Sequence, residues 1–396
     1  MNRPLFICPE YGTNDVNAVI EDIFISSLDK SKFQPTVLCK GNGDRNNNVQ
    51  TIEVKQNTII KKIECYFRTF IMSPDTYFFS WAIPSIFRIL RTKKMNYSYV
   101  HSVSIPYSTH FIGYFIHKWY KIPWVAHFFE PWEDNPYVRR RKNFVYNYFL
   151  RKWEAFVASN ADAIVHNNSV IIESWKNKYG FEVCKKMFLL SLPFDQGKMK
   201  KNQIIRNGNE INISHIGNLY GQRNASELIM VVKELVEQDT KFADRIKINL
   251  IGKVPQSDKN LITYYNLQNV FNLTGHISEE ECNGYYNRTD YFLVIEGKNQ
   301  GLLFYPSKII KYFFYEKPII GITTSGSVLD LELRKTGNIS IYYDKMDRLK
   351  EIFIKIINND GTLGCNNKLY WKNFCKEFVN NRYMEILDQM GVKTEK

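Results

Sequence analysis

One stretch of the chain, residues 301–322, reads Gly-Leu-Leu-Phe-Tyr-Pro-Ser-Lys-Ile-Ile-Lys-Tyr-Phe-Phe-Tyr-Glu-Lys-Pro-Ile-Ile-Gly-Ile. It predicts a helix that begins at Ser307 and Lys308, becomes apolar after one turn, and ends at Lys317 and Pro318, where an apolar strand starts. With Ser307 as a cap and the Lys308 charge beside it, this helix start favours a phosphate, because the first backbone N–H groups and the helix dipole attract anions. The stretch therefore predicts an α/β protein with a phosphorylated ligand.

The same alternation of strand and helix patterns continues on the N-terminal side of this stretch. Strict alternation is typical of parallel, doubly wound sheets. We expect strands at residues 5–8, 36–39, 99–102, 124–129, 163–166 and 188–192 in one series, and at 211–216, 246–251, 270–273, 291–295, 319–322 and 339–342 in a second. Two such series predict two Rossmann-like sheets.

The length of 396 residues exceeds one ordinary core and fits two domains. We predict an N-terminal domain of residues 1–197, a polar linker at 198–210, and a C-terminal domain of residues 211–368. The remaining residues, 369–396, carry an amphipathic, aromatic helix that we expect to cross back to the first domain. A cleft is expected between the two domains.

The composition limits which binding partners and which cellular compartment the sequence predicts. A net charge of +13 indicates an anionic partner, which is a nucleotide, an anionic lipid or a nucleic acid. Nucleic acid is the weakest of these, since no helix-turn-helix, RNP or zinc-finger pattern is present. The seven scattered cysteines contain no C-x-x-C pair and predict reduced thiols, with neither a metal site nor a disulfide framework. With no signal-peptide pattern and no apolar run of about 20 residues, we expect a cytoplasmic protein.

The opening stretch resembles the P-S-K-hydrophobic-x-E-Y…G-K-P-hydrophobic signature of GT-B nucleotide-sugar glycosyltransferases, especially the large retaining group called family four. The matching residues are Pro306, Ser307, Lys308, Tyr312, Lys317 and Pro318. Lys311 stands where the family carries the glutamate that holds the donor ribose, and Glu316 replaces the usual glycine. The acidic residue expected eight positions before that glutamate is replaced by Leu303, and Glu296 lies earlier than this position.

The resemblance implies transfer of a sugar, with retained configuration, from a nucleotide diphosphate to a lipid-linked or glycan hydroxyl in bacterial surface-polysaccharide assembly. No metal or other cofactor is expected, since no Asp-x-Asp lies in a suitable loop. Residues 217–223 resemble the family's G-R-x-x-x-x-K/R loop, with Gly217 and Arg223 matching and Asn218 replacing the first arginine. We expect Arg223 and Lys308 to stabilise the leaving diphosphate. The donor-binding residues predicted in this way are Gly12, Gly217, Arg223, Ser307, Lys308 and Lys311.

The predicted strand at 124–129 ends in His127-Phe128-Phe129-Glu130-Pro131-Trp132, where doubly wound sheets place ligands. This segment resembles the family's strand-end H-D/E-P motif. Glu130 is therefore predicted to act on the acceptor hydroxyl or to bind a sugar, and His127 and His101 to face the donor sugar. The alternatives are a loop carboxylate for Glu130 and buried structural roles for the two histidines.

Basic and aromatic residues alternate in the first domain. A run of four cations, Arg139 to Lys142, opens a helix expected at 138–158 that also carries Arg151 and Lys152, and a similar mixture occupies residues 61–94. This pattern is typical of a helix that lies on an anionic membrane surface, although a solvated charged face is the common alternative. It favours a lipid-linked acceptor and a peripheral position on the inner face of the membrane.

Two other functions remain open. Lys311, together with the missing acidic partner, is compatible with a non-catalytic GT-B protein that binds a partner glycosyltransferase or a glycan. A nucleotide-sugar epimerase on the same fold is the second alternative.

Overall fold

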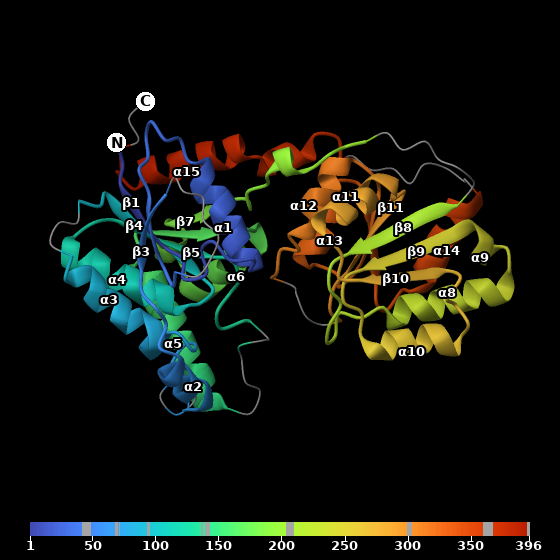
Figure 1. The fold of residues 1–396 in the computed structure, drawn as a ribbon, viewed down its shortest axis with the longest axis horizontal. Coiled ribbons are helices and arrows are strands. Elements are labelled where there is room, and N and C mark those ends of the chain that lie inside the picture. Colours follow the sequence, from blue (N-terminus) through green and yellow to red (C-terminus); the bar gives the residue numbers. More distant parts are fainter. Residues whose placement is uncertain are drawn as a thin grey trace. The chain divides into compact units, whose positions relative to one another are not determined.

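The computed structural model divides the chain into two compact units. Unit 1 comprises Met1–Phe194 and Asn373–Lys396, and unit 2 comprises Asp195–Lys372. Each unit is a sheet covered by helices (Figure 1). The residues that the structure describes are 1–41, 49–67, 70, 72–92, 96–135, 138, 143–202, 210–298, 303–358 and 367–393. Within these ranges no helix is long and apolar enough to cross a membrane.

Unit 1 contains a seven-stranded parallel sheet with the order β3-β2-β1-β4-β5-β6-β7. Its strands are β1 (Pro4–Ile7), β2 (Thr36–Cys39), β3 (Gln50–Glu53), β4 (Tyr99–Ser104), β5 (Trp124–Phe128), β6 (Ala163–His166) and β7 (Met187–Leu189). Most of these strands are buried along their whole length, because helices cover both faces.

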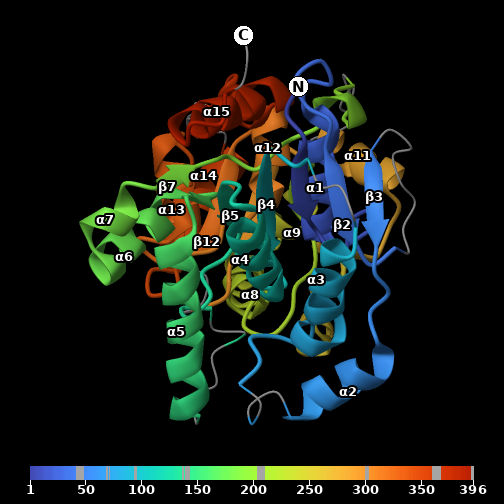
Figure 2. The ribbon, with the colours of Figure 1, turned by 90° about the vertical axis from the view of Figure 1, so that its left-hand side faces the viewer.

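Helices α1 and α15 lie side by side on one face of this sheet (Figures 1 and 2), where Phe24 of α1 packs against Tyr383 of α15. Helix α4 packs on the opposite face, and α3 and α5 pack against α4. The helices of unit 1 are α1 (Val16–Ser27), α2 (Thr58–Phe67), a π-helical turn (Phe78–Ala82), α3 (Ile83–Leu90), α4 (Ser108–Tyr120), α5 (Phe144–Asn160), α6 (Ser169–Tyr179), α7 (Phe181–Cys184) and α15 (Lys376–Gln389).

Unit 2 contains a six-stranded parallel sheet with the order β10-β9-β8-β11-β12-β13. Its strands are β8 (Ile211–Ile216), β9 (Ile246–Ile251), β10 (Phe271–Gly275), β11 (Tyr291–Ile295), β12 (Ile319–Thr323) and β13 (Ile339–Tyr342). Its helices are two 3-10 turns (Gln196–Lys198 and Tyr370–Phe374, the second continuing into unit 1), α8 (Ser226–Gln238), α9 (Phe242–Arg245), α10 (Gln256–Tyr264), α11 (Glu279–Arg288), α12 (Lys308–Tyr315), α13 (Val328–Lys335) and α14 (Asp347–Asn358).

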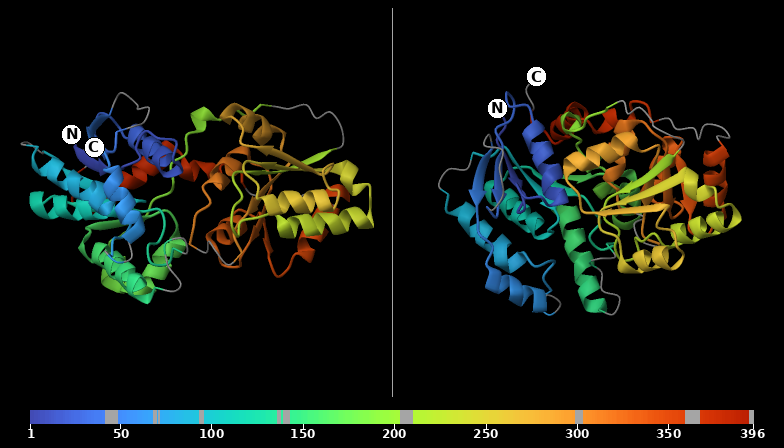
Figure 3. Two further views of the ribbon diagram at one scale, coloured as in Figure 1. Left: turned by 60° about the horizontal axis from the view of Figure 1, so that its bottom comes forward. Right: turned by 45° about the vertical axis from the view of Figure 1, so that its right-hand side comes forward.

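The two faces of this second sheet have different cores. On one face α8, α10 and α14 bury aliphatic residues against the strands, with α8 and α10 adjacent (Figure 3). On the other face Tyr312 of α12 stacks on Phe292 of β11 with ring centroids 4.2 Å apart. Together the two sheets confirm the predicted α/β class with two doubly wound sheets.

In each sheet the chain first builds strands in one direction and then returns to build them in the other. The two strands at this switch are β1 and β4 in unit 1, and β8 and β11 in unit 2. Open α/β sheets bind ligands beyond the carboxyl ends of the strands at such a switch point. The topology therefore marks one candidate ligand edge in each unit.

Two local predictions differ from the structure. The helix expected from residue 138 begins at Phe144, because Asn143 accepts a hydrogen bond from the Tyr146 N–H (2.8 Å) and so caps the helix there. The four cations from 139 to 142 lie outside the described residues. Strand β3 was not predicted, since it is a polar edge strand without a buried apolar run.

A buried carboxylate fixes the loop that follows β5. Glu154 on α5 is fully buried and accepts hydrogen bonds from the backbone N–H groups of Trp132 (2.7 Å) and Glu133 (2.8 Å). It also accepts from the Lys178 ammonium (2.6 Å) and the Tyr179 hydroxyl. Four donors from two elements thus converge on one side chain, which holds the loop after β5 against α5 and α6.

Replacing this carboxylate should destabilise unit 1. Glu154→Ala leaves two backbone N–H groups and the Tyr179 hydroxyl without this acceptor, whereas Lys178 keeps its ion pairs with Glu133 and Asp134, and we expect a loss of about 3 kcal/mol. Denaturant unfolding followed by tryptophan fluorescence measures this, because six of the seven tryptophans lie in unit 1. The matched control Glu237→Ala, at a solvent-exposed pair with Lys233, should leave the curve unchanged. Equal curves for both variants would contradict the assigned role.

Candidate functional site

Two cations lie at the switch point of the unit 2 sheet. Lys308 begins α12, and its Nζ lies 3.0 Å from Nε2 of His215 near the end of β8. Arg223, in the loop between β8 and α8, is close enough that its charge lowers the pKa of both Lys308 and His215. The sequence predicted Arg223 and Lys308 as diphosphate-binding residues from two separate segments, and the fold brings the two side chains together.

Gly217 makes room for the lysine. It directly follows β8 with φ of +136°, a conformation that favours glycine, and a Cβ at this position would lie 2.7 Å from Lys308 Nζ. Gly252 follows β9 with φ of +115°, and a Cβ at this position would lie 2.9 Å from the Gly217 carbonyl carbon. The predicted glycine position is therefore required so that the ammonium can pack directly on the backbone.

Neither cation has a carboxylate partner among the described residues. Lys308 contacts His215, and Arg223 lies over the ring of Tyr220 at 5.3 Å. Nearby surface lysines are paired, as Lys298 is with Glu227 (3.3 Å). Two adjacent cations that lack a counter-ion favour an anion, because each raises the electrostatic energy of the other.

The electrostatics of Lys308 follow from this arrangement. Burial, with a further contribution from the charge of Arg223, lowers the pKa of Lys308 to about 7. Burial also holds the pKa of His215 well below its usual range, and the two neighbouring cations act in the same direction. His215 is therefore a neutral imidazole that accepts a hydrogen bond from the lysine at Nε2.

The predicted cap at Ser307 is wrong in its detail. Ser307 has helical backbone angles, and its side chain accepts no hydrogen bond from the first turn. A capping side chain needs an extended backbone at the cap residue, and Ser307 is already part of the turn. The N–H groups of Ile309 and Ile310 in this first turn instead donate to the carbonyls of Pro306 (2.9 Å) and Ser307 (3.2 Å).

Glu296 was not selected from the sequence. It directly follows β11, is buried, and accepts hydrogen bonds from the hydroxyls of Thr323 and Ser327. Burial raises its pKa to about 7 against the opposing hydrogen bonds and the charge of Arg223. A signal was present, since the residue directly follows a buried strand at the ligand edge.

Three residues of the sequence signature have structural roles. The Tyr312 hydroxyl accepts from the Ile216 N–H (2.9 Å) and so fixes the end of β8. The Lys317 ammonium binds backbone carbonyls at the end of α11, including that of Tyr286 (3.2 Å). Glu316 has φ of +56°, which explains why a glycine suits this position, and its carboxylate accepts from the Leu369 N–H (3.1 Å).

Lys311, the residue at the expected ribose position, is directed to α11. Its ammonium lies 3.9 Å from the Glu279 carboxylate and 5.9 Å from the ring centroid of Tyr286. These contacts are on α11, whereas Lys308, three residues earlier, contacts β8.

The switch point of unit 1 also has a pocket. It measures about 20 Å³ and is lined by the β1–α1 turn, by α1 and by residues that end β4. Gly12 lies in that turn with φ of +81°, and Asp15 caps α1 by accepting from the Asn17 N–H (2.9 Å). The predicted glycine turn thus lies at the ligand edge of unit 1.

His101 and His127 contact each other beneath this edge. His101 Nε2 lies 3.3 Å from His127 Nδ1, and His101 Nδ1 lies 2.7 Å from the Tyr383 hydroxyl of α15. Both ring nitrogens of His101 are therefore occupied by protein. Nε2 of His127 is buried without a partner in the described structure, and His127 Nδ1 lies 3.9 Å from Glu21. Burial raises the pKa of Glu21 to about 8 and lowers that of His127 to about 3.

Glu130 lies in the loop after β5. Its carboxylate accepts from the Asn135 side chain (2.9 Å), which also donates to the Tyr107 hydroxyl (3.3 Å). Glu130 is thus hydrogen-bonded within its own loop, whereas the histidine pair faces α1 and α15. Among the described residues, no group of three or more His, Cys, Asp and Glu side chains is arranged to hold a metal ion.

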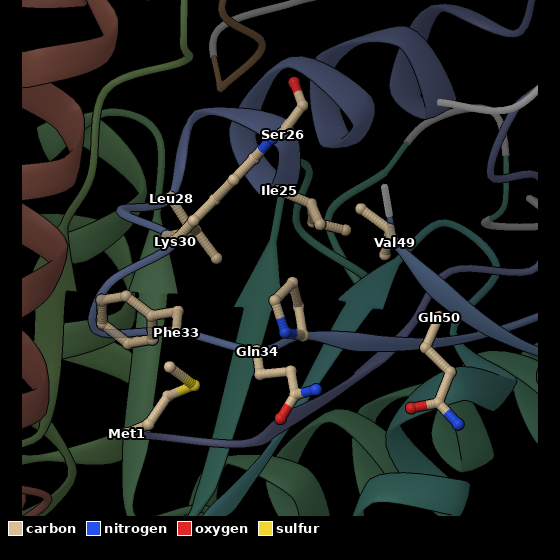
Figure 4. Close-up of a pocket in the computed structure, with 10 residues that line it drawn as sticks. Met1, Ile25, Ser26, Leu28, Lys30, Phe33, Gln34, Val49 and Gln50 are labelled. Carbon is tan, nitrogen blue, oxygen red and sulfur yellow. The ribbon is translucent and has the colours of Figure 1, made fainter. Parts of the chain in front are cut away.

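A larger pocket lies elsewhere on unit 1. It measures about 450 Å³ and is lined by Met1, the end of α1 and the segments that lead into β2 and β3 (Figure 4). These are the amino ends of the strands, opposite to the ligand edge. Its lining contains one charged side chain, Lys30, and none of the predicted site residues.

Comparison with known proteins gives a structural match without a sequence match. No protein-family model matches the chain, and no curated protein sequence matches it. HepE from Anabaena, solved in complex with UDP, superposes with a TM-score of 0.70 and 11% identity over 98% of this chain and 100% of that chain. Sucrose-phosphate synthase from Thermosynechococcus elongatus gives a TM-score of 0.69 and 13% identity, with 99% of each chain covered.

The lipopolysaccharide outer core galactosyltransferase WaaB matches with a TM-score of 0.63 and 10% identity, over 98% of this chain and 99% of that chain. These proteins share the arrangement of two parallel, doubly wound sheets described above. The chain has the GT-B fold.

Proposed function

We propose that this protein is a glycosyltransferase that takes a sugar from a nucleotide diphosphate. The observation that carries the proposal is the pair of cations without counter-ions, Arg223 and Lys308, at the switch point of the unit 2 sheet. When a glycosidic bond to a diphosphate breaks, negative charge grows on the leaving oxygen. Preorganised cations at that position stabilise the transition state without the help of a metal ion.

The fold comparisons support this proposal. HepE, a protein of the same fold, was solved with UDP and with UDP-glucose. We further propose a retaining reaction on a bacterial surface-polysaccharide acceptor, as the resemblance in residues 306–318 implies. A non-catalytic binding protein remains the second candidate, favoured by Lys311 at the ribose position.

Removing either cation should abolish most activity. Arg223→Ala and Lys308→Ala should each lower transfer by ~10²-fold or more, because each side chain stabilises charge that develops on the diphosphate. Transfer from radiolabelled UDP-, GDP- and ADP-sugars to extracted glycolipid measures this. Lys298→Ala is the matched control, since that lysine is already paired with a carboxylate. Activity within a few-fold of wild type in both test variants would remove them from the site.

Nucleotide selectivity should be weak. Lys311 cannot accept hydrogen bonds from ribose hydroxyls as a glutamate would, so affinity rests mainly on phosphate contacts. Calorimetry should find dissociation constants for UDP, GDP and ADP within ~100-fold, or about 2.7 kcal/mol, of one another. A stronger preference would show that other groups recognise the base or ribose.

We also propose that the acceptor is lipid-linked and that unit 1 binds the inner face of the membrane. Helix α2 presents exposed apolar side chains on both sides of Lys61 and Lys62 in the sequence, and the start of α5 presents others. Both helices extend from the same end of unit 1 (Figure 2). The exposed apolar residues are Ile59, Ile63, Tyr66, Phe67 and Phe70 near α2, and Phe144, Val145 and Tyr148 on α5. Apolar groups beside cations suit an anionic bilayer.

Vesicle binding tests this surface. The protein should sediment with phosphatidylglycerol vesicles at low salt and be largely released near ~0.5 M salt, because the ionic attraction is screened. Replacing Ile63, Tyr66 and Phe70 together by serine should weaken the binding several-fold. Tyr264→Ser, at an equally exposed aromatic residue of unit 2, is the control. Equal binding by both variants, or no binding by wild type, would favour a soluble glycan acceptor.

A further inference from the structure

The ammonium of Lys308 has surroundings that do not favour its charge. Its nearest polar neighbour is Nε2 of the buried His215 at 3.0 Å, and the backbone of Gly217 lies against its other side. The nearby full charge that acts on it is the like charge of Arg223. Burial and a second cation both disfavour an ammonium, whereas a diphosphate that arrives between the two cations reverses the balance.

We propose that His215 is the positioning residue for Lys308 and that this pair couples the binding of a nucleotide diphosphate to the uptake of one proton by Lys308. The proposal rests on the proposed function. A free Lys308 exchanges its proton with solvent, and the anion then holds the protonated form. His215 stays neutral throughout and supplies a lone pair that directs Nζ toward Gly217 and the end of β8.

Other titratable groups around this site are few. Glu296 from the end of β11 and Tyr343 beyond β13 act on Arg223, and Asp330 of α13 acts on Glu296. On the α11 side of α12, Glu279 pairs with Lys311 instead. Among the residues that the structure describes, Glu296 is the competitor, because its protonation would also change when an anion binds near Arg223.

The sign of the effect follows from linkage. The pKa of free Lys308 is about 7, and an anion raises it in the complex. Uptake should therefore be close to zero below ~pH 6, about 0.5 proton at pH 7, and close to one proton at ~pH 8. The affinity for the nucleotide sugar is highest below the pKa of Lys308 in the free protein. Above that pKa it falls about tenfold per pH unit, until the pH reaches the pKa of Lys308 in the complex.

Calorimetry of the full chain with UDP-glucose, GDP-mannose and ADP-glucose tests the proposal. In these diesters the phosphates do not titrate near neutral pH, so the proton must come to the protein. Binding heats at one pH in buffers of different ionisation enthalpy give the number of protons taken up. If no nucleotide sugar binds, both this proposal and the proposed function fail. If one binds without proton uptake, this proposal fails alone.

Single substitutions show which side chain takes up the proton. Lys308→Arg keeps the charge at all pH values and should bind with no uptake. Glu296→Gln should retain the wild-type uptake. His215→Ala removes the acceptor, so uptake at pH 7 should rise from about 0.5 toward one proton while affinity falls about tenfold. His276→Ala, at an exposed histidine of unit 2, is the control. Uptake that persists in Lys308→Arg, or is unchanged in His215→Ala, would overturn the assignment.

Discussion

The parallel arrangement of the strands determines where the loops that carry the candidate site residues lie in each unit. Each strand must be followed by a crossing segment that returns the chain to the same end, so all carboxyl ends of a sheet lie along one edge. In unit 2 this constraint brings the loop after β8 and the residue after β11 together, although about 80 residues separate them in the chain. The glycine that follows β9 then lets its backbone lie close to that of Gly217, and Gly217 lets the Lys308 amine pack on its backbone.

At that edge of the unit 2 sheet, two cations lie close together without a carboxylate partner among the described residues. Arg223 and Lys308 lie near each other and near a neutral histidine, while the nearby buried carboxylate of Glu296 accepts hydrogen bonds from two hydroxyl groups. Several other lysines of the unit have a carboxylate or carbonyl partner, as Lys298 has in Glu227 and Lys247 in the Asn269 carbonyl. Two neighbouring cations repel each other and so raise the electrostatic energy of the unliganded protein. Such pairs are typical of functional sites, where a bound ligand supplies the negative charge.

The signature residues divide into two kinds. Tyr312 and Lys317 fix the ends of β8 and α11. Glu316 occupies a left-handed position suited to glycine, and its carboxylate accepts a hydrogen bond from the Leu369 N–H. These residues of the segment that resembles the glycosyltransferase signature therefore support the packing around Lys308, whereas Lys311 departs from the signature and contacts α11.

The sequence by itself determined the fold class and most strand positions, because periodicity and chain order are local properties. It also singled out Gly217, Arg223 and Lys308, which the structure places near one another. It missed β3, whose polar edge lacks an apolar run, and placed the start of α5 too early because a capping asparagine outweighs an apolar pattern. Three contacts were decided only by the tertiary structure. His215 accepts a hydrogen bond from Lys308, Glu296 lies near Arg223, and the Tyr383 hydroxyl lies within hydrogen-bond distance of His101. These are contacts between residues far apart in sequence, and burial, which sets their charge state, exists only after the sheets and helices have packed.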